Sequence, residues 1–503
     1  MEHNDRDLQK GLLSGKLTRR EFIIRSVAAG FSVTAVANFL AACAPAPAAT
    51  PAPPQVVKET VEVQKVVTKE VEKQIEKVVT ATPVPTTAPA KLTVSGKLTM
   101  KLRAAFMPQG NEVLDALIKD WGKKNNIPVE VDIVSMNDLQ TIAATAVEAG
   151  AGPDIIEINQ GSAHLFAAKL ADVSSVCDDL SKRLGGFYPA AEEACKVGGK
   201  WLSVPRFFAP HAINYRTDLF KEAKIDPLPT TFDELLVAGQ KLMDAKLAPI
   251  AFPLGHAVGD GNDWLYAILW SFGGSDVAKD GKTVAIDSPE TRAAIEYVKK
   301  LYAVMPKDVT SYNDASNNTA MLAGAISATN NASTIYGTAR NQNTQYKTKD
   351  AAGKEVSAAL HTVISHFPYP KGPAGKVTYG EFMSSAIMGY SKNVDAAKAL
   401  LTYLNEPAIM SPWIMPNLGF VFPPFQAYKD MPLMPWNTDP KLAAFKDYAD
   451  TCHLPGYPST NFNGGTQAYA KWIVVDMFAN ACTGKTVDAA IAEAKTQLQS
   501  IYR

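Results

Sequence analysis

The feature that most constrains the fold is an alternation between two hydrophobic patterns early in the folded part of the chain. Apolar residues alternate with polar ones in some segments and recur at helical spacing in others. The order is strand, helix, strand, helix, strand over residues 98–106, 113–123, 129–134, 139–149 and 154–158. This order predicts an α/β layer built on a parallel sheet.

An open parallel sheet also predicts where a ligand binds. In such sheets ligands lie beyond the carboxyl ends of the strands. The loops that follow the first and third predicted strands, 107–111 and 159–162, are therefore expected to line a cleft.

Length and charge exclude several classes of protein. The chain has 503 residues, which suits about three domains, or two large ones with tails. Fifty basic side chains balance fifty acidic ones, so there is no excess of positive charge to hold nucleic acid or an anionic membrane surface. A mean hydropathy of -0.07 excludes a multi-span membrane protein.

The N-terminus has the pattern of an export signal. Arg19 and Arg20 precede a stretch without charge over 27–42, and small residues stand before Cys43. A membrane anchor or buried helix is the alternative, which the polar residues within the short apolar stretch disfavour. The arginine pair resembles a twin-arginine signal, and Leu-Ala-Ala-Cys at 40–43 resembles a bacterial lipobox. That resemblance implies a signal peptide over 1–42 and a lipidated Cys43.

A spacer is predicted over residues 43–96. Prolines among Ala and Thr favour extended, semi-rigid chain, and five Lys and five Glu are interleaved with Val over 56–80. The charged stretch is interpreted as a solvated spacer, with a short coiled coil that pairs lipoproteins as the alternative. The remaining residues, 97–503, are long enough for two substantial cores.

Two helix boundaries are marked by capping signals or periodicity. Thr231 and Glu234 form a predicted capping box that opens a helix running to about residue 246. Apolar residues at helical spacing over 486–501 predict a final amphipathic helix.

Signatures of enzymes and of metal sites are scarce. The seven histidines include no pair at helical spacing with a glutamate, and the sequence has no Cys-x-x-Cys. We therefore predict no metal, no cofactor and no catalytic residue, and assign His361 and His366 structural roles. A pair of carboxylates for glycoside hydrolysis stays open, because such a pair needs only to meet in space.

Several short motifs occur in an order that resembles one family. They are Pro-Asp-Ile-Ile at 153–156, Val-Pro at 204–205, Asn-Tyr-Arg-Thr-Asp-Leu-Phe at 214–220, Thr-Phe-Asp-Glu-Leu at 231–235 and Gly-Lys-Thr-Val-Asp-Ala-Ala at 484–490. The order is similar to that of the family 1 extracellular solute-binding proteins of ABC importers, whose best-known members bind sugars. The resemblance covers nearly all of 97–503.

The resemblance implies an α/β fold of the two-lobe periplasmic-binding-protein type (type II). Each lobe is expected to be a mixed sheet flanked by helices, with a hinge between the lobes. The first lobe is expected over 97–210 plus 368–405, and the second over 211–367 plus 406–503. Chain crossings are expected at 208–214, 367–372 and 405–411, where prolines punctuate the sequence.

A sugar needs amides and carboxylates for its hydroxyls and aromatic planes for its ring faces. The candidate ligand-binding residues are Gln109, Asn111, Asn159, Gln160, Arg206, Phe207, Asn262, Asp263, Trp264, Asn330, Asn331, Glu381, Asn461, Asn463 and Trp472. Several of them have a structural alternative: core packing for the tryptophans, turns for the asparagines and a surface salt bridge for Arg206. Family members have a tryptophan where this chain has Ala332, so a stacking platform is expected elsewhere or not at all.

Four cysteines besides Cys43 allow three disulfide pairings. Proximity in the sequence favours Cys177 with Cys195 and Cys452 with Cys482, and free buried thiols are the alternative.

The leading hypothesis is a substrate-binding lipoprotein, anchored by lipid to the outer face of the bacterial cell membrane. As a monomer it would deliver a sugar, unaltered, to the transmembrane subunits of an ABC permease. The first alternative is a binding protein for a non-sugar solute such as a polyamine. The others are a secreted carbohydrate-active enzyme and a surface adhesion lipoprotein.

Overall fold

The computed structural model describes residues 92–349 and 352–503. The predicted signal peptide, Cys43 and nearly all of the predicted spacer fall on residues 1–91, outside this part of the chain. Within the described residues, no helix combines the length and the apolar character that a membrane crossing requires.

The first sheet has five strands in the order β2-β1-β3-β13-β6. The three strands predicted from the alternating pattern are present as β1 (Leu98–Arg103), β2 (Val129–Val134) and β3 (Ile155–Asn159). β1 is parallel to both β2 and β3, which confirms the predicted parallel layer. β13 (Phe382–Ile387) and β6 (Val204–Phe208) continue the sheet with antiparallel pairing, so the sheet is mixed.

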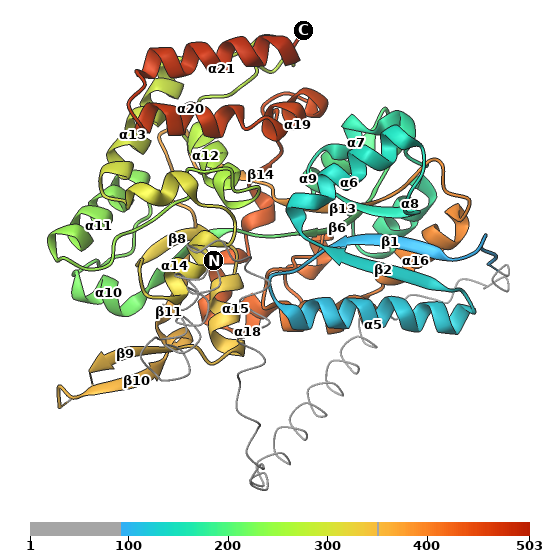
Figure 1. Cartoon of the computed structure of the whole chain (residues 1–503), viewed down its shortest axis with the longest axis horizontal. Helices are drawn as coiled ribbons and strands as arrows, with labels where there is room; N and C mark the ends of the chain where they lie inside the picture. Colours follow the sequence, from blue (N-terminus) through green and yellow to red (C-terminus); the bar gives the residue numbers. More distant parts are fainter. Residues whose placement is uncertain (1–91, 350–351) are drawn as a thin grey trace, which may run out of the picture. The chain divides into compact units, whose positions relative to one another are not determined.

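Helices cover both faces of the first sheet. α5 (Pro108–Asn125) and α16 (Val394–Leu404) lie on one face, and α6 (Met136–Ala149) and α9 (Pro189–Cys195) lie on the other (Figure 1). α8 (Ser174–Arg183) packs against β6 at the edge of the sheet and against α16. α5 buries Leu114, Ile118 and Trp121, which recur at helical spacing and pack on the sheet. Both predicted helices are confirmed, each beginning a few residues earlier than the hydrophobic pattern indicated.

The second sheet has three antiparallel strands in the order β11-β7-β8. They are β7 (Ala212–Arg216), β8 (Ala328–Asn331) and β11 (Ile364–Phe367). A single parallel bridge from Ile250 to Ala328 adds to its edge. α12 (Asp260–Ser271) packs on β8, and every one of its residues is buried.

The remaining elements complete the layers around the two sheets. The helices are α7 (Ser162–Leu165), α10 (Thr217–Glu222), α11 (Phe232–Asp244), α13 (Pro289–Ala303), α14 (Ser316–Leu322), α15 (Thr334–Asn341), α17 (Pro407–Ile414), α18 (Pro435–Thr438), α19 (Phe462–Ala470), α20 (Ile473–Cys482) and α21 (Val487–Ile501). The short strand pairs are β4 (Lys196–Val197) with β5 (Lys200–Trp201), β9 (Gln345–Lys349) with β10 (Glu355–Ala359), and β12 (Thr378–Tyr379) with β14 (Cys452–His453).

The capping signals are confirmed. The Thr231 side chain accepts a hydrogen bond from the Glu234 N–H, and the Glu234 carboxylate accepts one from the Thr231 N–H, so α11 begins with the predicted capping box. Thr486 caps α21 in the same way, by accepting from the Ala489 N–H.

The chain passes between the sheets more than once. The first crossing runs from β6, which ends at Phe208 in the first sheet, to β7, which begins at Ala212 in the second. The chain crosses back between β11 in the second sheet and β13 in the first. α17 packs against α5, on the side of the first sheet. The lobe boundaries stay a prediction, and this packing would move the third crossing beyond α17.

The predicted disulfides are not present, because the four described cysteines are free thiols. The Cys177 thiol donates to the Ser203 carbonyl at 3.7 Å, and the Cys452 thiol donates to the Ala449 carbonyl at 3.6 Å. Cys452 lies near Glu193, whereas Cys482 lies near Lys299 and Lys307. Proximity in the sequence is therefore a poor guide for Cys452 and Cys482, whereas Cys177 and Cys195 do lie near one another as free thiols.

Candidate functional site

A cluster of charged side chains lies where the elements of the two sheets meet. Arg103 ends β1, His211 lies in the connection from β6 to β7, Asp260 and Asp263 begin α12, and Glu381 precedes β13. None of the five residues is more than 5% exposed. The cluster, here called the interlobe cluster, therefore joins both sheets and the segments that connect them.

His211 is the centre of the interlobe cluster. Its Nε2 lies 3.0 Å from Asp260 Oδ1 and 3.5 Å from Glu381 Oε2. Its Nδ1 lies 3.0 Å from the Ala209 carbonyl oxygen and makes an ion pair with Asp263 Oδ2. The Ala209 carbonyl can only accept, so Nδ1 carries a proton. With Asp260 ionised, Nε2 carries a proton as well, and the ring is an imidazolium.

The electrostatics of the interlobe cluster agree with this protonation state. Burial by itself would lower the pKa of His211, but the Asp263, Asp260 and Glu381 carboxylates outweigh it and hold the pKa well above its usual range. Burial raises the pKa of Asp260, and the hydrogen bond from His211 opposes that rise.

Arg103 connects the first sheet to Glu381. Its guanidinium makes an ion pair with Glu381 Oε1, and its backbone N–H donates to Glu157 Oε2 at 2.7 Å. Gly259 lies against the same carboxylate, since a Cβ on Gly259 would lie 2.7 Å from Glu381 Oε2. Glu381 thus contacts the second-sheet side as well as Arg103.

Asparagines surround the Asp260 side chain. Its Oδ2 accepts from the Asn317 amide at 2.8 Å and from the Asn331 amide at 3.3 Å, while Asn330 donates to its backbone carbonyl at 3.1 Å. Asp314 accepts backbone N–H groups at the start of α12, and burial raises its pKa to about 6. These contacts fix the carboxylates that face His211.

His211, Asp263 and Glu381 also meet the distance criterion for a metal site. Each offers one ligand atom, and these atoms lie within 4.8 Å of one another. The hydrogen-bonding geometry favours an ion-pair network, because a metal ligand nitrogen cannot carry a proton and Glu381 already has Arg103 as its cation. The sequence did not indicate this group, because its three members are far apart along the chain.

Aromatic side chains lie beside the interlobe cluster. The Tyr379 and Tyr469 rings stack with centroids 6.2 Å apart, and the Trp472 ring stacks on His256 at 4.7 Å. The Tyr469 hydroxyl donates to the Val258 carbonyl at 3.0 Å and accepts from the Asn159 amide at 3.5 Å. Tyr469 therefore links the end of β3 to the loop before α12.

Close contacts join the two sides at two further points. Gly161, which follows β3, lies so near α19 that a Cβ there would be 2.6 Å from Thr466 Oγ1. Gly337 on α15 lies against the Met107 sulfur at the start of α5. A Cβ at Gly161 would force the short Thr466 side chain to shift, whereas the flexible Met107 side chain leaves more freedom at Gly337. Together the two contacts show that the two sides are closed on one another in this structure.

The structure brings five predicted site residues together. Asp263 and Glu381 belong to the interlobe cluster, Asn330 and Asn331 hold Asp260, and Asn159 meets Tyr469. Asn262 begins α12 beside them and donates to the Val258 carbonyl at 3.2 Å.

Three predicted residues lie in the core. Trp264 donates to the Pro253 carbonyl at 2.5 Å and packs on Phe252, so it offers no ring face to a solute. Arg206 is fully buried above the Trp413 ring, and Phe207 packs on the same ring. Arg206 makes the predicted salt bridge, but in the core and not at the surface. Its Nε lies 4.0 Å from Oε1 of the buried Glu157.

The other candidates have local roles or lie at the edges. Asn111 exchanges hydrogen bonds with the Ala105 backbone, Asn461 caps α19, and Asn463 donates to the His164 carbonyl at 3.0 Å. Gln109 is exposed on the first turn of α5. Gln160 is fully buried at a φ of 40°, and its amide has no hydrogen-bond partner among the described residues.

Sequence reasoning missed Arg103, His211, Asp260 and Tyr469. His211 carries a signal that could have been used, because it is an ionisable residue within the otherwise apolar run 207–213. Such residues are rarely buried without a charged partner.

Comparisons with known proteins give the family. The sequence model of the bacterial extracellular solute-binding proteins matches residues 108–410. The chain belongs to this family. The solved structure of maltose-bound MalE3 from T. maritima aligns over 80% of this chain and 99% of its own, with a TM-score of 0.67 at 22% identity, and confirms the two-lobe fold.

Two relatives in the family carry names that refer to binding. The chain is 25% identical over 299 residues to a probable ABC transporter-binding protein of Deinococcus radiodurans. It is 28% identical over 301 residues to the diacetylchitobiose binding protein DasA of Streptomyces coelicolor. These matches cover 56% and 57% of this chain and 66% and 64% of the relatives, which is less than two thirds of their lengths.

Proposed function

We propose that this solute-binding protein captures a sugar between its two lobes and delivers it, unaltered, to an ABC permease. The family match over residues 108–410 carries the proposal. The names of its relatives support the class of solute, since one binds diacetylchitobiose and the structural neighbour was solved with maltose.

The chemistry beside the interlobe cluster suits a sugar. Amides and carboxylates from Asn159, Asp263 and Glu381 would serve hydroxyl groups, and the Tyr469 ring, which is buried beside Asn159 here, would offer an apolar face once the lobes open. These groups come from both sides of the closed contact, so opening of the lobes would expose them and closing would desolvate them around a solute.

The location and partners of the protein belong to the same proposal. Membership of an extracellular family implies a place outside the cytoplasm. We infer that export uses the signal over 1–42, that Cys43 is lipidated and that the protein acts as a monomer on the outer face of the membrane.

A thermal-shift screen tests the class of solute. The full chain is heated with mono- and oligosaccharides, and a ligand present at 100 times its dissociation constant should stabilise it by about 2.7 kcal/mol. Spermidine serves as the comparison for the non-sugar alternative. A shift with spermidine and none with any sugar would contradict the proposal.

Recovery of the solute tests the enzyme alternative. After incubation with the protein, the stabilising sugar should elute unchanged from a chromatography column. Conversion to a shorter product would instead identify a carbohydrate-active enzyme.

A further inference from the structure

A pocket lies apart from the interlobe cluster. It has a volume of about 480 Å³ and is lined by Tyr188 and residues of α9, by Gln426 and Lys429, and by Ala449, Asp450, Cys452 and His453. Small-molecule sites commonly have volumes of about 300–1,000 Å³. We call this cavity the hinge pocket. None of the five residues of the interlobe cluster lines it.

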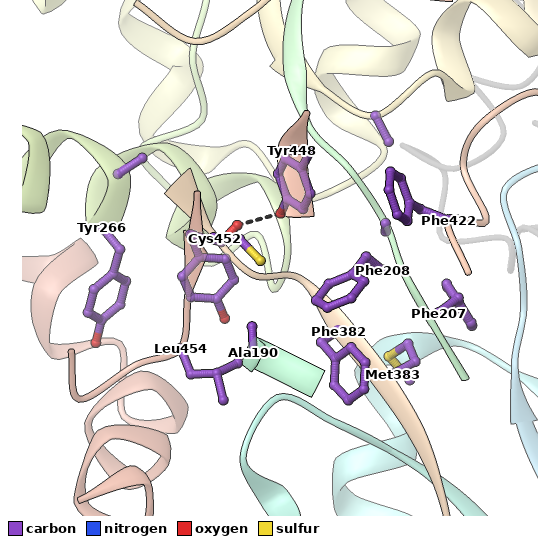
Figure 2. Close-up of a cluster of buried hydrophobic side chains, with 14 of the residues drawn as sticks. Ala190, Phe207, Phe208, Tyr266, Phe382, Met383, Phe422, Tyr448, Cys452 and Leu454 are labelled. Carbon is purple, nitrogen blue, oxygen red and sulfur yellow. Dashed lines mark hydrogen bonds between the residues drawn. The ribbon is translucent and has the colours of Figure 1, made fainter. Parts of the chain in front are cut away.

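The hinge pocket adjoins the hydrophobic layer that joins the lobes. Ala190 and Cys452 line the pocket and also belong to the buried cluster in Figure 2, together with Phe208 and Phe382. The Tyr448 hydroxyl in that cluster donates to the Tyr379 carbonyl and accepts from the Glu381 N–H at 3.1 Å. An apolar layer is thus contiguous with both the pocket and the charged site.

The walls of the hinge pocket come from both sides of the molecule. α9 packs on β6 and β13 of the first sheet. Cys452 and His453 form β14, which pairs with β12, and β12 packs on α12 of the second-sheet side. A molecule in the pocket would therefore contact both lobes.

One charge on the wall is not neutralised. Lys429 makes ion pairs with Asp447 and Asp450, so its charge is compensated. The Glu193 side chain is half-buried and makes no hydrogen bond or ion pair among the described residues, although it lines the pocket. A carboxylate in that position attracts a cation.

Neutral polar groups surround this carboxylate. The Tyr188 hydroxyl is buried without a hydrogen-bond partner in the described chain, and the charges of Asp450 and Lys429 act on it. Burial lowers the pKa of His453, and its ring stacks on Tyr457 at 3.9 Å. The wall therefore offers acceptors and ring faces to a donor-rich molecule.

We propose that the hinge pocket is a second binding site, which takes a small hydroxylated organic ammonium ion with Glu193 as its counter-ion. Because the occupant contacts both lobes, its binding is coupled to their closure. A solute that favours the closed state would therefore change the affinity of the hinge pocket for the amine. By thermodynamic reciprocity, the amine would change the affinity for the solute by the same factor.

Glucosamine is the probe for the direct test, with glucose as its neutral match. Calorimetric titration of the full chain, without any other sugar, should show binding of glucosamine that is at least about tenfold tighter than that of glucose, because an ion pair forms only with the amine. Equal affinity for the two, or no binding of glucosamine, would overturn the proposal.

Two variants on the same helix locate the site. Glu193→Gln should raise the dissociation constant of glucosamine by about tenfold or more, since it removes the counter-ion and keeps the shape. Glu192→Gln is the matched control, because Glu192 does not line the pocket. Its Oε2 lies 3.9 Å from Lys196 Nζ, in an ion pair that is open to solvent. It should leave the affinity within about twofold.

A third variant guards against a folding defect. Tyr188→Phe removes the unpartnered hydroxyl and should weaken glucosamine binding by a few fold with an unchanged melting temperature. Binding that survives Glu193→Gln but is lost in Asp263→Asn would place the amine in the interlobe cluster and overturn the proposal. A sugar held at the interlobe cluster would lose binding in Asp263→Asn and keep it in Glu193→Gln, so these variants separate a failure of this proposal from a failure of the proposed function.

Discussion

Removal of the His211 side chain should destabilise the protein strongly. Its imidazolium is the cation that Asp260 and Asp263 share, and both carboxylates are buried. Breaking a buried ion pair by deleting one partner costs about 3–5 kcal/mol, since it leaves charge uncompensated. We therefore expect His211→Ala to lower the free energy of unfolding by about 4 kcal/mol.

Urea denaturation and calorimetry measure this loss. With about 2.1 cal/mol/K of unfolding entropy per residue over roughly 400 folded residues, a loss of 4 kcal/mol lowers the melting temperature by about 5 °C. His256→Ala is the control, because His256 pairs with Asp476 at the surface with 56% of its side chain exposed. It should change stability by less than about 1 kcal/mol.

The pH dependence of the free energy of unfolding gives a second test of the interaction between His211 and its carboxylates. The pKa of His211 is raised in the folded protein, so its stabilisation is complete below the unfolded value of about 6.5 and is lost as the pH rises through the folded value. The gap between wild type and His211→Ala should therefore narrow on the alkaline side. A loss below about 1 kcal/mol at pH 6, or a gap that widens with pH, would refute the imidazolium assignment.

Three further predictions concern closure and pH. Gly161→Ala places a Cβ 2.6 Å from Thr466 Oγ1, so sugar affinity should fall by about tenfold or more and recover when Thr466→Ala is added. Burial lowers the pKa of His366 to about 4, so lowering the pH from 7 to 4 should cost wild type about 3 kcal/mol more stability than it costs His366→Asn. Burial raises the pKa of Asp276 to about 6, so wild type should lose about 2.5 kcal/mol relative to Asp276→Asn as the pH rises from 4 to 8. Urea titrations at several pH values measure the free energy of unfolding, and equal pH profiles of variant and wild type would contradict the two pKa predictions. An unchanged sugar affinity of Gly161→Ala would contradict the prediction on closure.

The elements of the first sheet were predictable because their signals are local. Alternation over β1 and β2 and helical spacing over α5 and α6 report burial of one face, which neighbouring residues encode. The capping box at Thr231 was predictable for the same reason, since its two hydrogen bonds lie within four residues.

The interlobe cluster was predictable only in part. Asp263 and Glu381 were selected by the resemblance to the family, but their common partner His211 lies 52 and 170 residues away in the sequence numbering. Tertiary packing decides such meetings, so periodicity carries no trace of them. Trp264 shows the converse: it lies in the sequence beside site residues, but its side chain is buried against Phe252 and the Pro253 carbonyl.

The distance between the lobes is the most direct test of the central claim. Spin labels at Lys123→Cys on α5 and Lys300→Cys on α13 report on the two sides in the full chain, with Cys43 and Cys482 changed to Ser. Pulsed electron spin resonance should show a longer distance without solute and a shorter, narrower one once a stabilising sugar is added. One distance that no sugar changes would contradict closure on a solute.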